Sequence, residues 1–349
     1  MRSKNQRSCF LEMGCGWWAL YASIAVVLSY IAEKTCFFTK IANPFCENLI
    51  IYKWHQRCYD KSQSTQNNSK GGTDLKIAFW SNGRGRACVT SNLACISVLS
   101  ALDCPEDRTI IFENHRNIIN LESTLFNHYS NREVKENYQY EVESGLGKVL
   151  RIVEQGEEIT KERLYCQTRD YLGKRLFYLP SNDRSAQNLE YYMEREAVRT
   201  MRFLEQHSDR VLVDTTAAPL VSSRKILQKA DMVVVNLSQN LQFLEHFFRN
   251  YSSIQKRAFY LVGNYDANSQ LTRGEIMKRY NISGSRIGVI PHNVHFSDAI
   301  SNGQIIPFLL KNYSSPAHAE NHDFMVAARE AVGLFHYQIR KYERGGGEE

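Results

Sequence analysis

The chain has 349 residues, which is enough for one large α/β domain with appendages or for two small domains. Its hydrophobic content of 43% and charged content of 23% are ordinary for a globular protein. The net charge of +6 is concentrated at the start, because residues 1–74 hold nine Lys/Arg and five Asp/Glu while the rest of the chain holds 34 and 32. A nearly neutral body excludes a basic nucleic-acid footprint, so nucleic acid is not indicated as a partner.

Residues 1–62 form an N-terminal segment that contains an uncharged run at 13–32. The apolar core of this run, 17–32, is long enough to be a membrane-spanning helix. Basic residues flank the run on both sides, so the positive-inside comparison does not decide its orientation. One interpretation is an anchor that tethers a cytoplasmic body to the cytoplasmic membrane.

A polar linker follows at 63–74, with the sequence QSTQNNSKGGTD. The first predicted strand of the body begins directly after it, at Leu75. Leucine codons include TTG, which bacteria also use to start translation. A second interpretation is therefore that Leu75 initiates a shorter protein, and the sequence leaves both interpretations open.

From residue 75 onward, short apolar runs alternate with longer amphipathic stretches. The runs are predicted strands at 76–80, 109–113, 176–179, 211–214, 232–236, 258–263 and 287–291. The stretches between them are predicted helices at 89–102, 118–129, 189–207, 222–229, 240–251 and 272–280. Several runs are continuous in Val, Ile or Phe, as in strands that are buried on both faces. The pattern predicts an α/β fold with a mostly parallel central sheet and helices on both faces.

Two further regions lack this alternation. Residues 130–175 are charged and rich in tyrosine, and we expect small helices there that cover one edge of the sheet. The C-terminal segment 317–349 contains a predicted helix at 323–342 whose apolar face consists of Phe324, Ala328, Val332, Phe335 and Ile339. This face is predicted to dock on the body, and a membrane-touching tail is the alternative.

The nine cysteines show no CxxC pair and no Cys/His spacing typical of zinc. Five lie in the first 58 residues and four are scattered through the body. They are predicted to be reduced thiols of a cytosolic protein. Cys88 and Cys95 are seven residues apart on one predicted helix, which favours a shared face and core packing over an iron–sulfur ligand.

The first predicted strand runs into a turn that contains Gly83 and Gly85, and then into a helix. A strand, a glycine-containing turn and a helix in this order present backbone N–H groups and a helix N-terminus to phosphate. The turn is followed by Asn92-Leu93-Ala94. The whole stretch resembles the deviant Walker A loop of the ParA/MinD group of P-loop NTPases, whose pattern is KGGxGK[ST] followed by NLA.

This resemblance implies a nucleotide-binding loop made of Gly83, Arg84, Gly85, Arg86, Ala87 and Cys88. It places Ser81 at the signature lysine, which in the group reaches the phosphates across a dimer. It places Arg86 at the P-loop lysine, where a planar fork replaces a point charge. It places Ala87 at the metal-binding threonine, so the hydroxyl ligand of magnesium is missing. The expected cofactor is ATP, with Mg²⁺ doubtful.

Later segments resemble the same group in the same order, which predicts a P-loop domain at 75–316. Glu113 and His115 stand at switch I, where the group has Asp-x-Asp. Asp214 ends the strand that resembles Walker B, which implies a metal ligand acting through water and, with Arg86, a catalytic candidate. Asn264 ends the strand whose terminal asparagine contacts adenine.

Each of these assignments has a structural alternative that the sequence leaves open. The glycine turn could be a vestigial turn that binds nothing, and Asp214 could be a vestigial carboxylate that caps the strand end. Asn264 could be a turn-forming residue. His115 is predicted to be a hydrogen-bonding surface group rather than a catalytic base.

Within the group, the segments 76–82 and 287–309 are most similar to the TadZ/CpaE branch of pilus-assembly proteins. In this comparison, 287–291 fits the final strand and 298–303 fits the loop after it. Residues 1–74 do not resemble the receiver-like domain that commonly precedes the ATPase in that branch.

The resemblance implies a dimerising scaffold or localisation factor for a Tad-type pilus or secretion assembly, with weak or no ATP hydrolysis. The expected partners are a second copy, through the nucleotide face, and proteins of the pilus or secretion machinery. One alternative is an active ATPase that positions a surface structure, a plasmid or chromosome, or a division site. Another is a membrane-anchored interaction module that does not bind nucleotide.

Overall fold

The computed structural model describes residues 75–83, 85–126, 145–157, 160–181 and 186–345. The apolar run at 13–32, the linker at 63–74 and Arg84 lie outside the described residues. Among the helices that are described, none is both long and apolar enough to cross a bilayer. The described residues belong to one compact unit, which includes the C-terminal helix.

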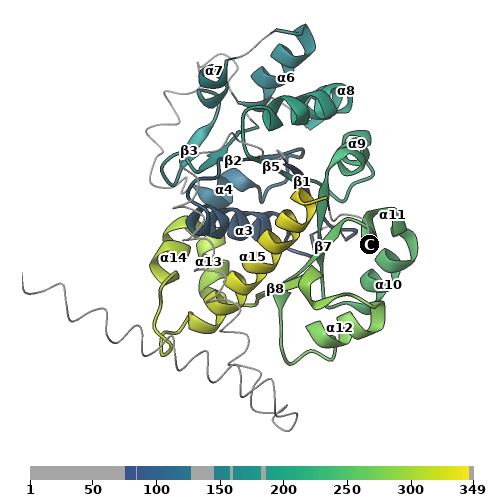
Figure 1. Ribbon diagram of the computed structural model, residues 1–349, viewed down its shortest axis with the longest axis vertical. Coiled ribbons are helices and arrows are strands. Elements are labelled where there is room, and N and C mark those ends of the chain that lie inside the picture. Colours follow the sequence, from purple (N-terminus) through teal and green to yellow (C-terminus); the bar gives the residue numbers. More distant parts are fainter. Residues whose placement is uncertain (1–74, 84, 127–144, 158–159, 182–185, 346–349) are drawn as a thin grey trace, which may run out of the picture. The chain divides into compact units, whose positions relative to one another are not determined.

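A single sheet forms the middle of this unit (Figure 1). In the described residues it has eight strands, in the order β3-β4-β2-β5-β1-β6-β7-β8. Only the edge strand β3 is antiparallel to its neighbour. The strands are β1 (Leu75–Trp80), β2 (Thr109–Glu113), β3 (Arg169–Tyr171), β4 (Leu176–Tyr178), β5 (Arg210–Asp214), β6 (Met232–Leu237), β7 (Ala258–Tyr265) and β8 (Ile287–Pro291).

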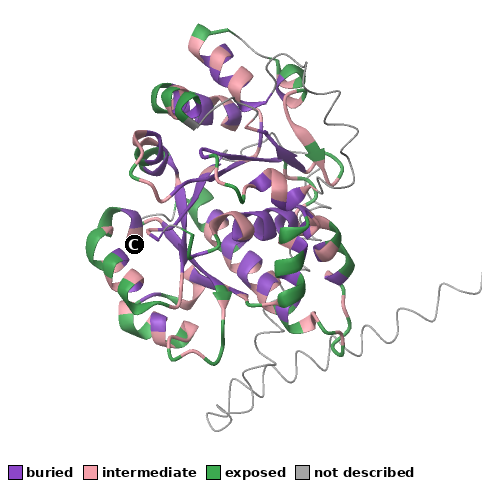
Figure 2. Ribbon diagram, turned by 180° about the vertical axis from the view of Figure 1, so that it is seen from behind, coloured by how far each residue is buried: buried purple, intermediate pink, exposed green. Residues whose placement is uncertain are grey.

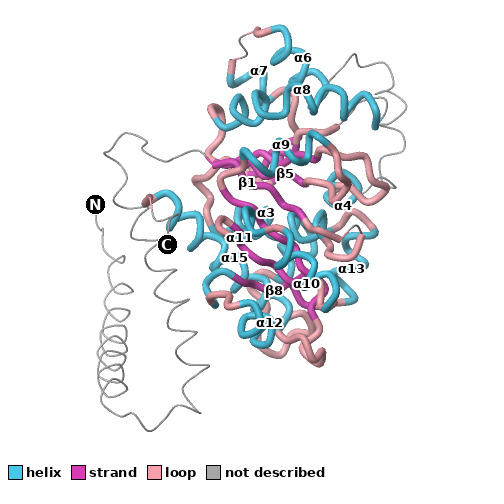
Figure 3. Tube along the Cα trace, turned by 90° about the vertical axis from the view of Figure 1, so that its right-hand side faces the viewer, coloured by secondary structure: helices cyan, strands magenta, loops and turns pink. Residues whose placement is uncertain are grey.

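Helices cover both faces of the sheet, so the molecule has three layers (Figure 3). One face carries α6 (Leu146–Gln155), α7 (Lys161–Tyr165), α8 (Ala186–Glu205), α9 (Val221–Lys229), α10 (Leu241–Asn250), α11 (Ser252–Gln255) and α12 (Arg273–Tyr280). The other face carries α3 (Val89–Asp103), α4 (Leu121–Leu125), α13 (Val294–Ser301), α14 (Ile305–Asn312) and α15 (His322–Glu343). The fold class predicted from the sequence is confirmed.

Continuous apolar strands account for the two cores. Side chains alternate along a strand, so Ala78 and Trp80 of β1 join the core under α6–α12 while Ile77 and Phe79 join the core under α3 and α15. The strands are buried along nearly their whole length (Figure 2). A strand in the middle of a parallel sheet must be apolar on both faces, which is why these runs lack a polar alternation.

The parallel register brings the strand ends together at one edge of the sheet. Asp214 at the end of β5 pairs with Phe79 of β1 on one side and with Glu113 of β2 on the other. The adjacent strands β1 and β6 lead to α3 and α10, which lie on opposite faces. Connections that leave in opposite directions open a crevice at the carboxyl ends of the strands, where open α/β sheets bind ligands.

The seven predicted strands are all present, with ends within two residues of the prediction. The strand β3 was not predicted, because three residues on an exposed edge are too few to show a periodic pattern. The helix predicted at 118–129 was wrong in extent. Asn120 forms a capping box with Ser123, so α4 begins at Leu121, and residues 127–129 lie outside the described part.

Two differences concern the C-terminal part. The segment 298–303 was predicted as a loop, but α13, which Asn293 caps at its start by accepting the N–H of Phe296 at 2.8 Å, runs to Ser301. The predicted apolar face of the last helix is confirmed, since all five of its residues are buried against the sheet and α3. Docking on the body, rather than an exposed tail, is therefore the observed arrangement.

Candidate functional site

The loop between β1 and α3 contains most of the predicted nucleotide-binding residues, and it is anchored on α10. Ser81 is buried, and its hydroxyl oxygen accepts the N–H of Gly83 at 3.1 Å. Asn82 donates from Nδ2 to the carbonyl oxygen of Phe243 at 2.9 Å. Ser81 is thus committed to its own loop, at the position where the resembled group has an outward-reaching lysine.

Phe243 of α10 also determines how the middle of the loop packs. A Cβ on Gly83 would lie 2.9 Å from the Phe243 ring, so a larger residue here would force this ring to shift. The guanidinium carbon of Arg86 lies 5.7 Å from the centroid of the same ring, within the range of a cation–π interaction. Arg86 remains exposed, so its charge is available to a ligand.

The end of the loop is locked against β6 and β7. Cys88 has a left-handed conformation, with φ of 51°, and α3 begins at the next residue. Asn92 in the first turn of α3 donates from Nδ2 to the carbonyl oxygen of Ala87 at 3.2 Å and to Oδ1 of Asn236 at 2.8 Å. A Cβ on Gly263 would lie 2.5 Å from that same Nδ2, so β7 needs a glycine where the loop crosses it.

An open pocket of about 310 Å³ lies at the crevice between the strand ends. It is lined by Arg86, Ser238, Gln239, Asn240, Gly263 and Asn264. These residues come from the loop after β1 and from the ends of β6 and β7. Asn264 is exposed, with φ of 49°, and its Oδ1 lies 2.8 Å from Nδ1 of His292. Two predicted nucleotide-binding residues, Arg86 and Asn264, therefore share one pocket.

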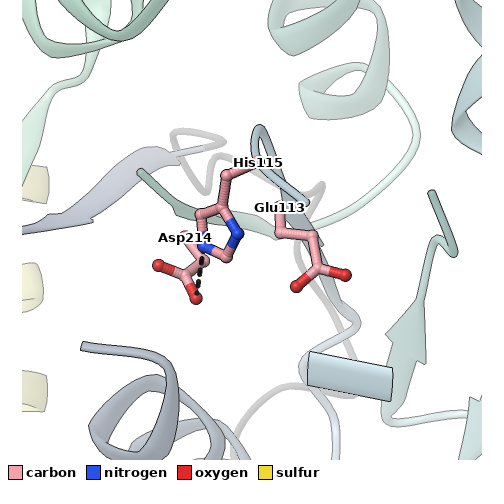
Figure 4. Close-up of side chains that lie close together, drawn as sticks. All are labelled: Glu113, His115 and Asp214. Carbon is pink, nitrogen blue, oxygen red and sulfur yellow. Dashed lines mark ion pairs between the residues drawn. The ribbon is translucent and has the colours of Figure 1, made fainter. Parts of the chain in front are cut away.

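A second cluster, which we call the Asp214 cluster, consists of Glu113, His115, Asp214 and Thr90. Figure 4 shows the ring of His115 between the carboxyl groups of Asp214 and Glu113. One ligand atom from each of these three residues lies within 4.8 Å of the others. Oδ2 of Asp214 lies 3.2 Å from Nε2 of His115, and it also accepts a hydrogen bond from the Thr90 hydroxyl at 2.6 Å. Asp214 is only 1% exposed.

Glu113 uses both carboxyl oxygens within the protein. Oε2 accepts the N–H of Leu121 at 2.8 Å, which fixes the start of α4, and Oε1 accepts the hydroxyl of Tyr178 at 2.9 Å. Burial raises the pKa of Glu113 to about 7, and the Asp214 charge adds to this. The charge of His115 and the two hydrogen bonds oppose the rise without cancelling it.

His115 is oriented by its backbone neighbour. The N–H of Asn117 donates to Nδ1 at 3.4 Å, so Nε2 is the nitrogen that carries the proton toward Asp214. Burial lowers the pKa of His115, but the hydrogen bond and charge of Asp214, together with the charge of Glu113, outweigh it and raise the pKa overall. The prediction of a surface histidine was wrong, since this residue is buried.

The geometry changes two further expectations from the sequence. The resemblance assigned no role to Thr90, which lies three residues beyond Ala87. It does reach Asp214, because α3 begins only at Val89 and Thr90 is in its first turn. The shared face of Cys88 and Cys95 was wrong, since Cys88 precedes the helix and is exposed while Cys95 is buried. The sequence signal that could have identified Thr90 as a site residue is its hydroxyl, one residue after the predicted helix start.

The described chain is similar to solved structures of ParA and MinD proteins. One is a ParA family ATPase from Chlorobium tepidum, with 14% identity, a TM-score of 0.56, and coverage of 74% of this chain and 98% of that one. A chain of the MinC:MinD cell division complex of Aquifex aeolicus matches with 14% identity, a TM-score of 0.54, and coverage of 75% and 96%. The septum site-determining protein MinD of Pyrococcus horikoshii, complexed with Mg-ADP, matches with 12% identity, a TM-score of 0.54, and coverage of 74% and 94%.

No protein-family model matches the sequence, and no curated protein sequence matches it. At identities of 12–14% the likeness to solved structures concerns the fold. The chain has the ParA/MinD-like fold.

Proposed function

We propose that this chain binds a nucleoside triphosphate in the pocket between β1, β6 and β7. The observation that carries the proposal is that Arg86 and Asn264 meet there, at the crevice where adjacent strands lead to opposite faces. The guanidinium of Arg86 offers a fork of donors to phosphate oxygens. The side-chain amide of Asn264 offers both a donor and an acceptor to a base. A protein of the same fold, MinD of Pyrococcus horikoshii, is described in complex with Mg-ADP.

We further propose that hydrolysis is weak or absent and that the bound nucleotide acts as a ligand. The support comes from three positions in or beside the loop. Ser81 is buried and bonded to Gly83, and Ala87 has no hydroxyl. Asp214 is already hydrogen-bonded by Thr90 and contacted by His115. Groups that would position a metal ion and an attacking water are therefore missing or occupied.

The proposed role of the nucleotide is to stabilise a dimer through the face that carries the pocket. A ligand that binds the dimer better than the monomer shifts the equilibrium toward the dimer. The dimer would be a scaffold for a Tad-type pilus or secretion assembly, which rests on the likeness of 76–82 and 287–309 to the TadZ/CpaE branch. Neighbouring genes for a pilus secretion ATPase and its membrane platform would support this role, and chromosome-partition genes would contradict it.

Titration of the full-length protein with a fluorescent ATP analogue tests the pocket. We expect saturable binding that Arg86→Ala weakens at least tenfold, because hydrogen bonds to a charged group contribute about 1.5–3 kcal/mol. Arg224→Ala is a matched control, since Arg224 is exposed on α9 and does not line the pocket. No binding by the wild type, or equal binding by both variants, would contradict the proposal.

Light scattering with and without nucleotide tests the dimer. The chain has a mass of 40.4 kDa, and we expect the measured mass to double when ATP saturates the pocket. Arg86→Ala should need a correspondingly higher ATP concentration for the same change. A mass that ATP does not alter would rule out nucleotide-controlled dimerisation and would leave the pocket itself untouched.

A further inference from the structure

One oxygen of the Asp214 carboxylate, Oδ2, has two hydrogen-donating neighbours. It receives the Thr90 hydroxyl at 2.6 Å and faces Nε2 of His115 at 3.2 Å. Both partners present hydrogen atoms to this oxygen, whereas a metal ion needs its lone pairs. The side chain is only 1% exposed, so water molecules of a hydrated ion cannot reach it without displacing one of these partners.

The neighbouring carboxyl group, that of Glu113, does not replace Asp214 as a metal ligand. Glu113 already accepts hydrogen bonds on both oxygens, from Leu121 and from Tyr178. Moving it toward an ion would leave a buried backbone N–H without a partner at the start of α4, which is unfavourable. The three ligand atoms converge within 4.8 Å, but two of the three residues are held in place by other contacts.

The loop offers no substitute ligand at the position nearest the predicted phosphates. Ala87 has no hydroxyl and is itself buried. Thr90 has one, but that hydroxyl is donated to Asp214. Mg²⁺ requires near-octahedral oxygen ligands and is usually held by one or two carboxylates together with waters and phosphates. The residues present do not fit a protein-held magnesium ion.

His115 supplies the positive partner that a divalent ion would otherwise give to the buried carboxylate of Asp214. A buried carboxylate must be paired to avoid a large desolvation cost, and a divalent ion commonly supplies the pairing in nucleotide sites. Here the imidazole N–H and the threonine hydroxyl supply it from within the chain. Oδ2 of Asp214 therefore has its partners without an ion.

From this geometry we infer that nucleotide binding by this chain requires no divalent cation held by the protein, because His115 and Thr90 occupy Oδ2 of Asp214 and Glu113 is held by Leu121 and Tyr178. The inference rests on the proposed nucleotide pocket. It concerns how the nucleotide is held. It differs from the resemblance, which implies that Asp214 binds a metal ion through water.

The test is the affinity of the full-length protein for a fluorescent ATP analogue, measured in excess EDTA and again in Mg²⁺. We expect the two dissociation constants to agree within about twofold. Binding that appears only with Mg²⁺ would overturn the inference and leave the nucleotide pocket standing. Absence of binding in both buffers would overturn the proposed function, and the inference with it.

A second measurement uses metal ions alone. Thermal unfolding of the wild type with Mg²⁺, Mn²⁺ or Zn²⁺ and no nucleotide should show no rise in Tm, since Glu113 and Oδ2 of Asp214 are already held by hydrogen bonds within the protein. A rise that disappears in His115→Ala but persists in His318→Ala, a histidine exposed elsewhere on the surface, would show a metal centre and overturn the inference.

A variant tests the part assigned to His115. His115→Ala frees one side of Asp214, and we expect its nucleotide affinity to become at least fivefold tighter in Mg²⁺ than in EDTA. His318→Ala should retain the wild-type ratio. An unchanged ratio in a His115→Ala protein that still unfolds cooperatively would contradict the role given to His115, and the wild-type comparison stands whether or not this variant folds.

Discussion

At the scale of single residues, Asp214 shows how a motif residue gains partners that the linear sequence does not state. Its position at the end of a strand was predicted from an apolar run ending in a carboxylate. Its contacts come from Thr90 and His115, which are 124 and 99 positions away in the chain and reach it through the register of β1, β5 and β2. These two contacts hold one of its carboxylate oxygens, Oδ2, inside the protein.

The same cluster predicts how stability depends on pH. The pKa of Glu113 is raised from 4.5 to about 7, so the folded state keeps a proton that the unfolded state releases as the pH rises through this range. The pKa of His115 is also raised, so its contribution is lost as the pH rises further, above 6.5. The free energy of unfolding should fall from pH 5 to pH 8, by up to about 1.4 kcal/mol per pH unit for each group.

Glu113→Gln isolates the first contribution. Its amide oxygen can accept the Leu121 N–H, and its NH₂ group can donate to the Tyr178 oxygen. The variant should match the wild type at pH 5 and exceed its stability by about 1–3 kcal/mol at pH 8 in urea unfolding. Glu343→Gln, at an exposed position of α15, should leave the pH dependence unchanged. Parallel curves for wild type and Glu113→Gln would contradict the assignment.

Part of the cluster was visible in the sequence and part was not. Glu113, His115 and Asp214 were identified because a resemblance aligned them with known positions at strand ends. Thr90 was missed because its contact with Asp214 depends on how α3 packs beside the end of β5, 124 positions away in the chain, although the start of α3 at Val89 was predicted correctly.

At the scale of elements, the loop after β1 is held by contacts to β7 and α10 rather than by its own turn residues. The tightest of these contacts is between Gly263 of β7 and the side chain of Asn92. Gly263→Ala places a methyl group 2.5 Å from Asn92 and 3.0 Å from the Ala87 carbonyl oxygen, which should cost about 1–3 kcal/mol and weaken nucleotide binding. Urea unfolding and the nucleotide titration measure the two effects.

Gly274→Ala is the matched control for this change. Gly274 lies in α12, and the nearest atom to a new Cβ is Thr272 Oγ1 at 4.0 Å. Alanine favours a helix by up to about 1 kcal/mol over glycine, so this variant should be no less stable than the wild type. Equal stability of Gly263→Ala and Gly274→Ala would show that the loop does not depend on its contact with β7.

The last helix closes one face of the sheet. The ring of Phe335 lies 6.2 Å from that of Phe79 and 5.9 Å from that of Phe259, centroid to centroid. Phe335→Ala should lower the free energy of unfolding by about 3–5 kcal/mol. Tyr337→Ala, at a position that is 50% exposed, should change it by less than about 0.5 kcal/mol. A small effect at Phe335 would mean that α15 is a loose appendage.

The elements that the sequence predicted best are short strands whose residues form a continuous apolar run. The strands β2 and β8 match the prediction residue for residue, because both are short runs buried between two layers of helices. The helix α4 was predicted too long because Ile118 and Ile119 read as part of an apolar face, yet they are 97% and 62% exposed in the loop before its cap. Local capping by Asn120 overrides the apolar pattern there.

At the scale of the whole molecule, the pocket and the Asp214 cluster lie at the same edge of the sheet and are joined by the loop and first turn of α3. The fold class and seven of the eight described strands were predicted from alternation and order of motifs, because a three-layer α/β arrangement depends on many residues and tolerates local changes. The proposed function depends on a handful of residues at that edge. The fold therefore identifies the place of the site, and the residues decide its chemistry.

The most direct test of the central claim, that ATP is bound in this pocket but not consumed, is to follow the fate of bound ATP. Full-length protein is mixed with radiolabelled ATP and Mg²⁺, the complex is isolated at intervals, and the bound label is separated into ATP and ADP. We predict that the label remains ATP over hours, in the wild type and in Asp214→Asn alike. Steady conversion to ADP by the wild type that Asp214→Asn abolishes would contradict the account.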